Sequence, residues 1–133
     1  MAEAEGKSFS FEGTDQIQSE YLEVFDFHDT HLRIETRTSE FSCVCPFSGL
    51  PDFADLVIEY YPDGGCCVEL KSLKYYLITY RNVGIYQEAA TSRIYNDLKK
   101  ALKTERLKVT TLYNTRGGFD TVCIKGNLEL KEL

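Results

Sequence analysis

The order of hydrophobic periodicities constrains the fold of this chain most, because it switches once from alternating to helical spacing and once back. Aromatic and β-branched residues alternate with polar ones in the first half, as in the run from His31 to Thr36, and this pattern is typical of strands. Leu70, Leu73 and Leu77 then recur at helical spacing. The predicted segments are strands over 21–41 and 55–61, a short extended piece over 66–69, helices over 71–81 and 87–102, and strands over 107–113 and 119–124.

This order of strand, strand, helix, helix, strand, strand predicts an α+β domain. Its sheet should be antiparallel, with both helices on one face. We expect residues 20–133 to form this single domain and the small, polar residues 1–19 to form a mobile amino-terminal arm. The second sheet face and the sheet edges need covering in so small a domain, so we also expect a homo-oligomer, with a ring of identical subunits as the economical solution.

Length and charge narrow the classes of partner. A chain of 133 residues fits one domain, and its formal net charge of −6 argues against nucleic acid or an anionic membrane as a partner. A small-molecule ligand remains compatible with this length and charge. No stretch approaches the length of a membrane span, and residues 1–10 lack the basic and apolar parts of a signal peptide, so we expect a cytoplasmic protein.

Five cysteines, an odd number, indicate reduced thiols rather than a disulfide framework. Zinc is the serious alternative, since four thiolates could come from Cys43, Cys45, Cys66 and Cys67. The spacing is wrong for a zinc knuckle, because Cys66 and Cys67 are adjacent and point to opposite faces if extended. Both histidines, His28 and His31, fall in the first predicted strand. We therefore expect no metal.

The segment from Cys45 to Ala54 places a thiol and the carboxyl of Asp52 seven residues apart in one loop. Pro46 and Pro51 restrict the backbone angle φ, and Gly49 supplies a turn. The loop therefore has few conformations to lose when the chain folds. Thiol and carboxyl are the residue types of a nucleophile and its proton donor. The alternative is a proline-rich connector that carries an ordinary buried cysteine.

A second dense group of polar residues spans 69–76. Lys71 and Lys74 lie three residues apart, hence about one helical turn apart on the same face, and Arg116 could join them. Phosphate groups of a dinucleotide would suit such a cationic stripe, whereas a solvated helix face is the simpler interpretation. No G-x-G-x-x-G occurs in the chain, which excludes a Rossmann site.

Taken together, these segments resemble the family of 7-cyano-7-deazaguanine reductases, in its short, single-module type, from about Thr36 to Gly126. The residues that carry the resemblance are the Cys45 to Ala54 loop, the octet Glu69-Leu70-Lys71-Ser72-Leu73-Lys74-Tyr75-Tyr76, the pair Gln87-Glu88 and the triplet Arg116-Gly117-Gly118. The octet is the motif that separates these reductases from relatives of GTP cyclohydrolase I. The resemblance implies the tunnelling fold (T-fold), an oligomeric barrel with active sites between neighbouring subunits, and reduction of the free base's nitrile by two NADPH in the pathway to queuosine of transfer RNA.

The resemblance also implies roles for particular residues. Cys45 would attack the nitrile carbon to form a covalent thioimide, and Asp52 would deliver a proton to the nitrile nitrogen. Glu88 would hold the purine-like ring, while Gln87 departs from the family pattern, in which many members carry His. The residues implied for the base pocket are Val68, Glu69, Leu70, Gln87 and Glu88. Those implied for NADPH are Lys71, Ser72, Lys74, Arg116 and Gly117.

Two other functions stay open from the sequence. One is a non-reducing enzyme of the same fold, amidine-forming or cyclohydrolase-like, against which the intact lysine octet speaks. The other is a non-catalytic, ring-forming binding protein in which Cys45 is merely buried. The remaining thiols are expected to pack in the interior: Cys43, Cys66, Cys67 and Cys123.

Overall fold

The computed structural model describes residues 6–7 and 9–130, so the first part of the expected arm lies outside the described residues. Two short 3-10 turns, η1 (Thr14–Gln16) and η2 (Ser19–Tyr21), precede the regular elements. These are β1 (Val24–Asp26), β2 (Ile34–Val44), β3 (Pro51–Tyr60), β4 (Cys66–Val68), α1 (Leu70–Ile78), α2 (Gln87–Leu102), β5 (Leu107–Tyr113) and β6 (Val122–Asn127).

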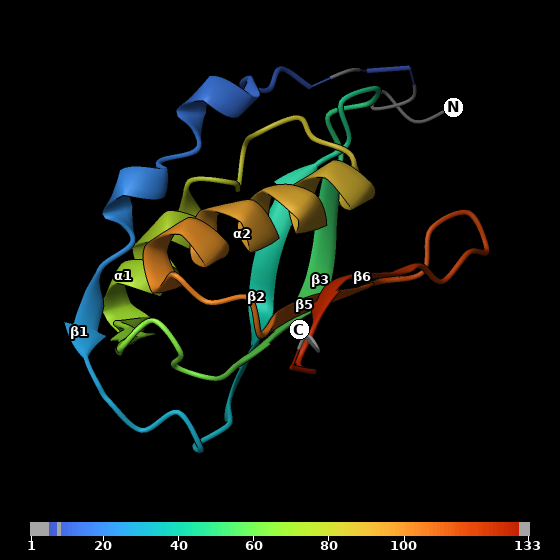
Figure 1. The fold of residues 1–133 in the computed structure, drawn as a ribbon. Helices are drawn as coiled ribbons and strands as arrows, with labels where there is room; N and C mark the ends of the chain where they lie inside the picture. Colours follow the sequence, from blue (N-terminus) through green and yellow to red (C-terminus); the bar gives the residue numbers. More distant parts are fainter. Residues whose placement is uncertain (1–5, 8, 131–133) are drawn as a thin grey trace.

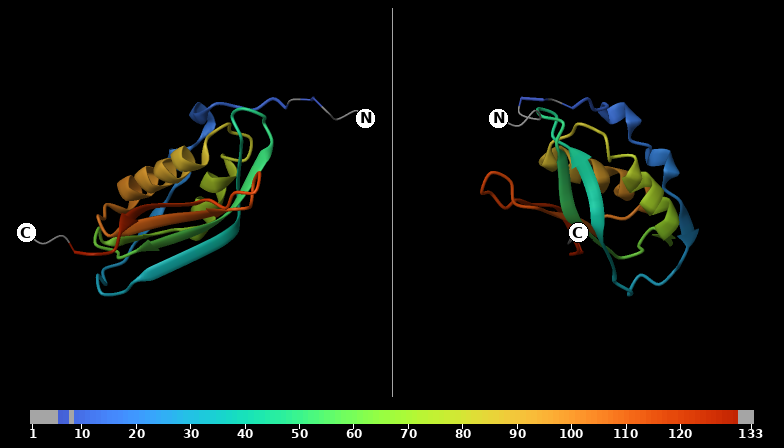
Figure 2. Two further views of the ribbon diagram at one scale, coloured as in Figure 1. Left: turned by 90° about the vertical axis from the view of Figure 1, so that its right-hand side faces the viewer. Right: turned by 180° about the vertical axis from the view of Figure 1, so that it is seen from behind.

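Four strands form the main sheet, in the order β2-β3-β5-β6, and every neighbouring pair is antiparallel. Both helices lie on one face of this sheet, and α2 contacts β5 and β6 (Figure 1, Figure 2). The predicted α+β class and the single-sided helical layer are confirmed. The core lies between these layers and includes Leu56, Ile58, Ile94, Leu98 and Val109, each at most 1% exposed.

The single first strand predicted over 21–41 is wrong. The chain instead forms β1, a loop that carries His28 and His31, and then β2. β1 pairs antiparallel with β4 in a separate two-stranded sheet. The alternation in the sequence is real, but backbone pairing with a strand 40 residues downstream cannot be read from a local period.

Other boundaries move by a few residues. β3 begins at Pro51, four residues before its predicted start, so Asp52 lies on a strand rather than in the loop. α1 ends at Ile78 instead of 81, and β6 runs over Val122–Asn127 rather than 119–124. The bounds predicted for α2 and β5 agree with the structure.

A β-bulge in β2 changes which residues face the helices. Thr38 pairs with Leu56 but Phe41 pairs with Ala54, so β2 has one extra residue between the two pairs. Even-numbered residues of β2 face the helices before the bulge and odd-numbered ones after it, because a single inserted residue reverses the two-residue period. Phe41 and Cys43 are consequently fully buried, at 0% exposure.

A part-buried hydrogen bond joins the two helices and belongs to a small polar cluster. The hydroxyl of Tyr76 in α1 donates to Asp97 Oδ2 in α2 at 2.6 Å and lies 2.6 Å from the hydroxyl of Tyr80. Arg93 donates to the same carboxylate at 2.8 Å, which balances its charge. None of the helices in the described part of the chain is long and apolar enough to span a membrane.

The described part of the expected arm lies against the domain. The backbone of Glu12 donates to Asn82 O at 2.8 Å and accepts from Gly84 N at 2.9 Å, and Ile17 is 5% exposed within the core. Phe11 covers Gly84 so closely that a Cβ there would lie 2.2 Å from its ring. The arm's mobility stays a prediction, but these contacts tie residues 11–17 to the segment that precedes α2.

Gly126 and Gly118 allow a matched test of how closely β6 approaches β5. Both have positive φ, +90° and +85°, but a Cβ at Gly126 would lie 2.0 Å from Leu107 O, whereas Gly118 has nothing within 4 Å. We expect Gly118→Ala to cost roughly 1–3 kcal/mol of unfolding free energy from backbone strain alone. Gly126→Ala should cost about 1–3 kcal/mol more, because the backbone must also shift. Urea unfolding of both variants checks this, and equal losses would contradict it.

Candidate active site

Cys45 lies at the start of a tight turn that closes the β2–β3 hairpin. Its backbone N–H donates to Leu50 O at 2.9 Å, and its carbonyl accepts from Gly49 N at 2.8 Å. Gly49 has φ +73°, and a Cβ there would lie 2.4 Å from the carbonyl oxygen of Phe9. Only glycine fits this position, so the turn that presents Cys45 is held both by its own backbone and by the arm.

The turn lowers the pKa of the Cys45 thiol to about 7. The main cause is the hydrogen bond from the Ser48 backbone amide, which is assisted by the Phe47 amide, the Ser48 hydroxyl and the Arg116 guanidinium. Burial of Cys45, which is 8% exposed, opposes the shift. Amides that point back at a sulfur atom stabilise its anion in the same way as they cap a helix start. Cys43, two residues earlier, shows the opposite effect, since burial raises its pKa to about 12. The reactive thiol predicted at Cys45 therefore has a physical basis.

Asp52 lies on β3 directly opposite Cys43 and is 3% exposed. Arg116 Nη1 is 2.8 Å from both carboxylate oxygens and donates a hydrogen bond to Oδ2. Among the described residues, Oδ1 is buried without a hydrogen-bond partner. Burial raises the pKa of Asp52, although the charge and hydrogen bond of Arg116 oppose the shift. A buried carboxyl whose pKa is raised, and one of whose oxygens accepts no hydrogen bond, is suited to hold a proton for a ligand.

The start of α2 and the β5–β6 hairpin complete this end of the domain. Gln87, Arg116, Gly117 and Phe119 line a cavity of about 380 Å³. Glu88 is exposed in the first turn of α2 and lines a separate cavity of about 330 Å³ with Thr91, Ser92 and Cys123. The structure thus brings Cys45, Asp52, Arg116, Gly117, Gln87 and Glu88 to one end of the sheet.

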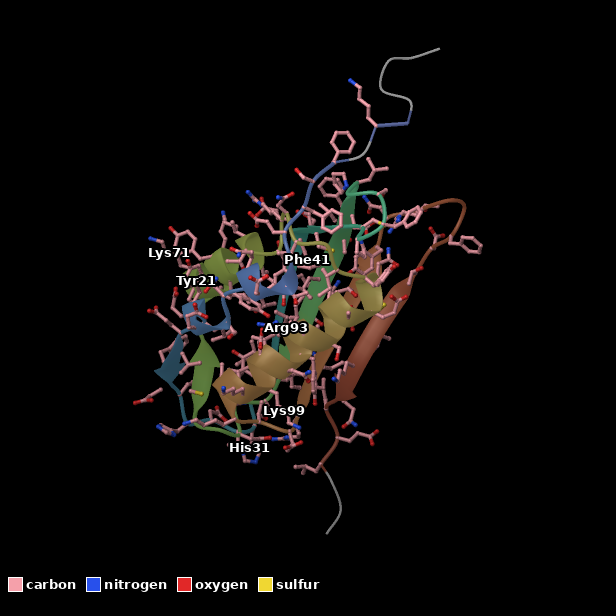
Figure 3. All side chains as sticks on the ribbon, turned by 90° about the horizontal axis from the view of Figure 1, so that it is seen from above. Tyr21, His31, Phe41, Lys71, Arg93 and Lys99 are labelled. Atoms are coloured by element: carbon pink, nitrogen blue, oxygen red, sulfur yellow. The ribbon has the colours of Figure 1, made fainter. Side chains whose placement is uncertain are left out.

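The other predicted site residues lie at a different end of the domain. β4 and the start of α1 are remote from the 45–50 loop in all views (Figure 1, Figure 2), and Lys71 lies beside Tyr21, away from that loop (Figure 3). Val68 is 4% exposed and Leu70 is 58% exposed. Glu69 caps α1: its carboxylate accepts from the amides of Lys71 at 2.9 Å and Ser72 at 2.7 Å, which lowers its pKa. Its role toward a substrate stays a prediction.

The three residues of α1 that are predicted to bind NADPH differ in whether their polar groups are accessible to a ligand. Lys71 and Lys74 are exposed and, within the described residues, form no ion pair with a carboxylate. Lys71 lines a cavity of about 540 Å³ with Glu20, Tyr21 and Tyr75. Ser72 is 5% exposed, and its hydroxyl donates to Glu69 O at 2.7 Å and accepts from Glu23 N at 2.9 Å. The lysines are free for an anion, whereas the Ser72 hydroxyl already has structural partners.

Sequence reasoning missed two residues of this site. Ser48 supplies the largest stabilisation of the Cys45 thiolate, and the turn-forming run Cys-Pro-Phe-Ser-Gly was the available signal. Tyr113 is buried beside Cys43, and its hydroxyl donates to Gln87 O at 3.4 Å; no local pattern could have indicated this. The described residues contain no group of three metal-ligating side chains.

Comparisons with known proteins bear on this arrangement. The family described as "QueF-like protein" matches residues 51–131. Proteins of Thermotoga petrophila and Thermotoga maritima, both named NADPH-dependent 7-cyano-7-deazaguanine reductase, are 58% identical over 132 residues, covering 99% of this chain and 96% of theirs. A protein of the same name from Chlorobium phaeobacteroides is 49% identical over 111 residues, covering 81% of this chain and 93% of its own. The crystal structure of the archaeosine synthase QueF-Like in the apo form has a TM-score of 0.63 at 23% identity, over 75% of this chain and 95% of that one, and so shares the fold.

The lowered pKa of Cys45 predicts selective alkylation. At pH 7.5 iodoacetamide should label Cys45 at least about tenfold faster than Cys43, since thiolates are the reactive form and burial keeps Cys43 protonated. Peptide mass spectrometry after brief labelling measures both rates. Equal labelling of the two thiols in the native protein would contradict the site geometry.

Burial of Asp52 predicts a stability gain when its charge is removed. Its raised pKa means that ionisation disfavours the folded state, so this cost is absent at low pH and grows as pH rises through the folded-state pKa. Asp52→Asn should therefore raise Tm at pH 7.5 by a few degrees, which corresponds to a gain of about 1 kcal/mol in the free energy of unfolding for a domain of this size. The gain should shrink toward pH 4. Calorimetry across this range, with the exposed Asp55→Asn as control, checks the result; a loss of Tm at pH 7.5 would oppose it.

Proposed function

The chain belongs to the family of QueF-like proteins, and from that premise we propose that it reduces the nitrile of 7-cyano-7-deazaguanine to an aminomethyl group. NADPH is the hydride donor, and the product serves queuosine biosynthesis. The observation that carries this function is the 58% identity over nearly the whole chain to proteins named for it. The activated Cys45 beside the buried Asp52 is the arrangement that the reaction needs.

Reduction of a nitrile with these residues proceeds through sulfur. The Cys45 thiolate adds to the nitrile carbon, a C–S bond replaces one C–N π bond, and the proton held by Asp52 goes to nitrogen. A hydride from the first NADPH then reduces the C=N bond. Expulsion of the Cys45 thiolate leaves an imine, which takes the second hydride and a further proton to give the amine. Two NADPH and two protons per nitrile balance the four-electron change.

The residues suited to recognise the substrate lie at the same end of the domain as Cys45, at the start of α2. The Glu88 carboxylate, exposed at the start of α2, is suited to accept two N–H bonds from a guanine-type edge. Gln87 lines the cavity with Arg116 and offers neutral hydrogen bonds where a histidine could also move a proton. Proton delivery in this chain therefore falls to Asp52.

We further propose a homo-oligomer in which neighbouring subunits complete each site. Within one chain, the residues implied for the base pocket lie at two different ends of the domain, with Val68 to Leu70 remote from Cys45 (Figure 1). The free edges β2 and β6 offer backbone groups for strand pairing between copies.

The five free cysteines suit a reducing compartment such as the cytoplasm.

The α1 lysines fit the phosphates of NADPH. Lys71 and Lys74 are exposed and form no ion pair within 4 Å among the described residues, although the charge of Lys71 helps to lower the pKa of Glu69; both ammonium groups can be reached by an anion. The exposed ring of Tyr75 lies 5.8 Å from Lys71 Nζ and offers a flat surface beside them. Arg116 and Gly117 border the cavity next to Asp52 and could meet a second part of the same molecule.

Limiting substrate tests the function directly. We expect the purified protein to oxidise two NADPH per 7-cyano-7-deazaguanine, with the aminomethyl base identified by mass spectrometry. Cys45→Ala should lose turnover by at least about a thousandfold, because no other thiol is activated there. Cys66→Ala, which removes a thiol from the far end of the fold, should retain it. Turnover by Cys45→Ala would exclude the sulfur route, and no NADPH oxidation by the wild type would exclude the reductase.

A further inference from the structure

Arg116 holds a position that a cofactor-binding role alone does not explain. Its Nη1 atom is 2.8 Å from both oxygens of Asp52, and the guanidinium is also one of the groups that lower the pKa of the Cys45 thiol. One cation therefore serves both reacting groups of the site. The contact is specific, because Asp52 is the one carboxylate within 4 Å of Arg116 among the described residues.

The backbone fixes this contact although the arginine is on a hairpin. Arg116 and Phe119 exchange both backbone hydrogen bonds, at 2.9 and 2.8 Å, and Asn114 N donates to Phe53 O at 3.0 Å beside Asp52. The Arg116 side chain is nevertheless 47% exposed, and one side of it borders the cavity of about 380 Å³. An anion that enters this cavity can reach the guanidinium while the hairpin keeps its structure.

We propose that Arg116 is a positioning residue that pairs with Cys45 and Asp52 in the ligand-free protein, and that a phosphate group which binds Arg116 releases Asp52. Before release, the cation favours the thiolate of Cys45 and the carboxylate of Asp52. After release, burial alone governs Asp52 and favours its protonated form, which is the form that donates to nitrogen. When the Arg116 cation leaves Asp52, a proton takes its place on the carboxylate, so the negative charge of Asp52 is neutralised in both states.

Other titratable groups around this triad are accounted for. Cys43 of β2 is buried opposite Asp52 and stays protonated, and burial holds the pKa of Tyr113 of β5 well above its usual range. From α2, the neutral Gln87 faces the cavity. Asp120 of the hairpin accepts a hydrogen bond from Thr115 and lies apart from the triad's contacts. Arg116 is thus a charge that does not titrate in this range and that acts on both Cys45 and Asp52.

The rate at which iodoacetamide alkylates Cys45 between pH 5 and 10 tests this role. The wild type should show a midpoint near pH 7. Arg116→Gln should raise the midpoint by up to about one pH unit, because an opposite charge is lost while the Ser48 amide, the main cause of the lowered pKa, stays in place. Arg116→Lys should recover part of that shift, and Arg81→Gln, an exposed arginine outside the triad, should match the wild type. Circular dichroism confirms that each variant folds.

Adding NADP⁺ to the same assay tests release. A ligand that draws Arg116 away should move the wild-type midpoint toward that of Arg116→Gln and leave the variant's midpoint unchanged. Simple shielding would instead lower the plateau rate at high pH without moving the midpoint, and that result would overturn release. An unshifted Arg116→Gln profile would overturn the role of Arg116.

The inference rests on the proposed function only in naming NADP⁺ as the probe. If the wild type reduces the nitrile but Arg116→Gln has an unshifted alkylation profile, the inference fails and the proposed function stands. If the profile shifts as expected but no NADPH is oxidised, Arg116 keeps its positioning role and the proposed function fails. The two experiments therefore separate the two claims.

Discussion

The site depends on the backbone pairing between β2 and β3. Their antiparallel register sets Asp52 opposite Cys43 and joins the strands through the turn that starts at Cys45. The bulge after Thr38 reverses which residues face the helices, and without it the cysteines would project from the open face of the sheet. One extra residue therefore decides whether a thiol and a carboxyl share the same side.

From that pairing, two opposite electrostatic effects follow over a short distance. Backbone amides of the turn stabilise the anion of Cys45, while burial on the strand disfavours the anion of Asp52. Their pKa values consequently move toward each other, which is the condition for a nucleophile and an acid to act together near neutral pH. Arg116 contacts Asp52 at 2.8 Å and also favours the anion of Cys45, so its single charge acts on both groups.

The segment before α2 links this chemistry to the rest of the chain. Val83 and Ile85 bond the backbone of Val44, next to Cys45, while Asn82 and Gly84 bond Glu12 of the arm. The same segment leads into Gln87 and Glu88 at the helix start. Packing of the arm and placement of Gln87 and Glu88 are therefore parts of one structure, even though Glu12 and these two residues are separated by more than 70 positions in the sequence.

The sequence by itself determined the α+β class and the bounds of α2 and β5, and it indicated a thiol and a carboxyl close together in the chain, because these follow from local periodicity and from residue chemistry. The octet and the hairpin triplet also allowed the family to be predicted. Only the tertiary structure decided that Asp52 is on a strand, that β1 pairs with β4, and that Arg116 lies against Asp52 rather than in open solvent. Strand register, bulges and the burial that shifts a pKa arise from contacts between distant residues, and a local pattern carries no information about them.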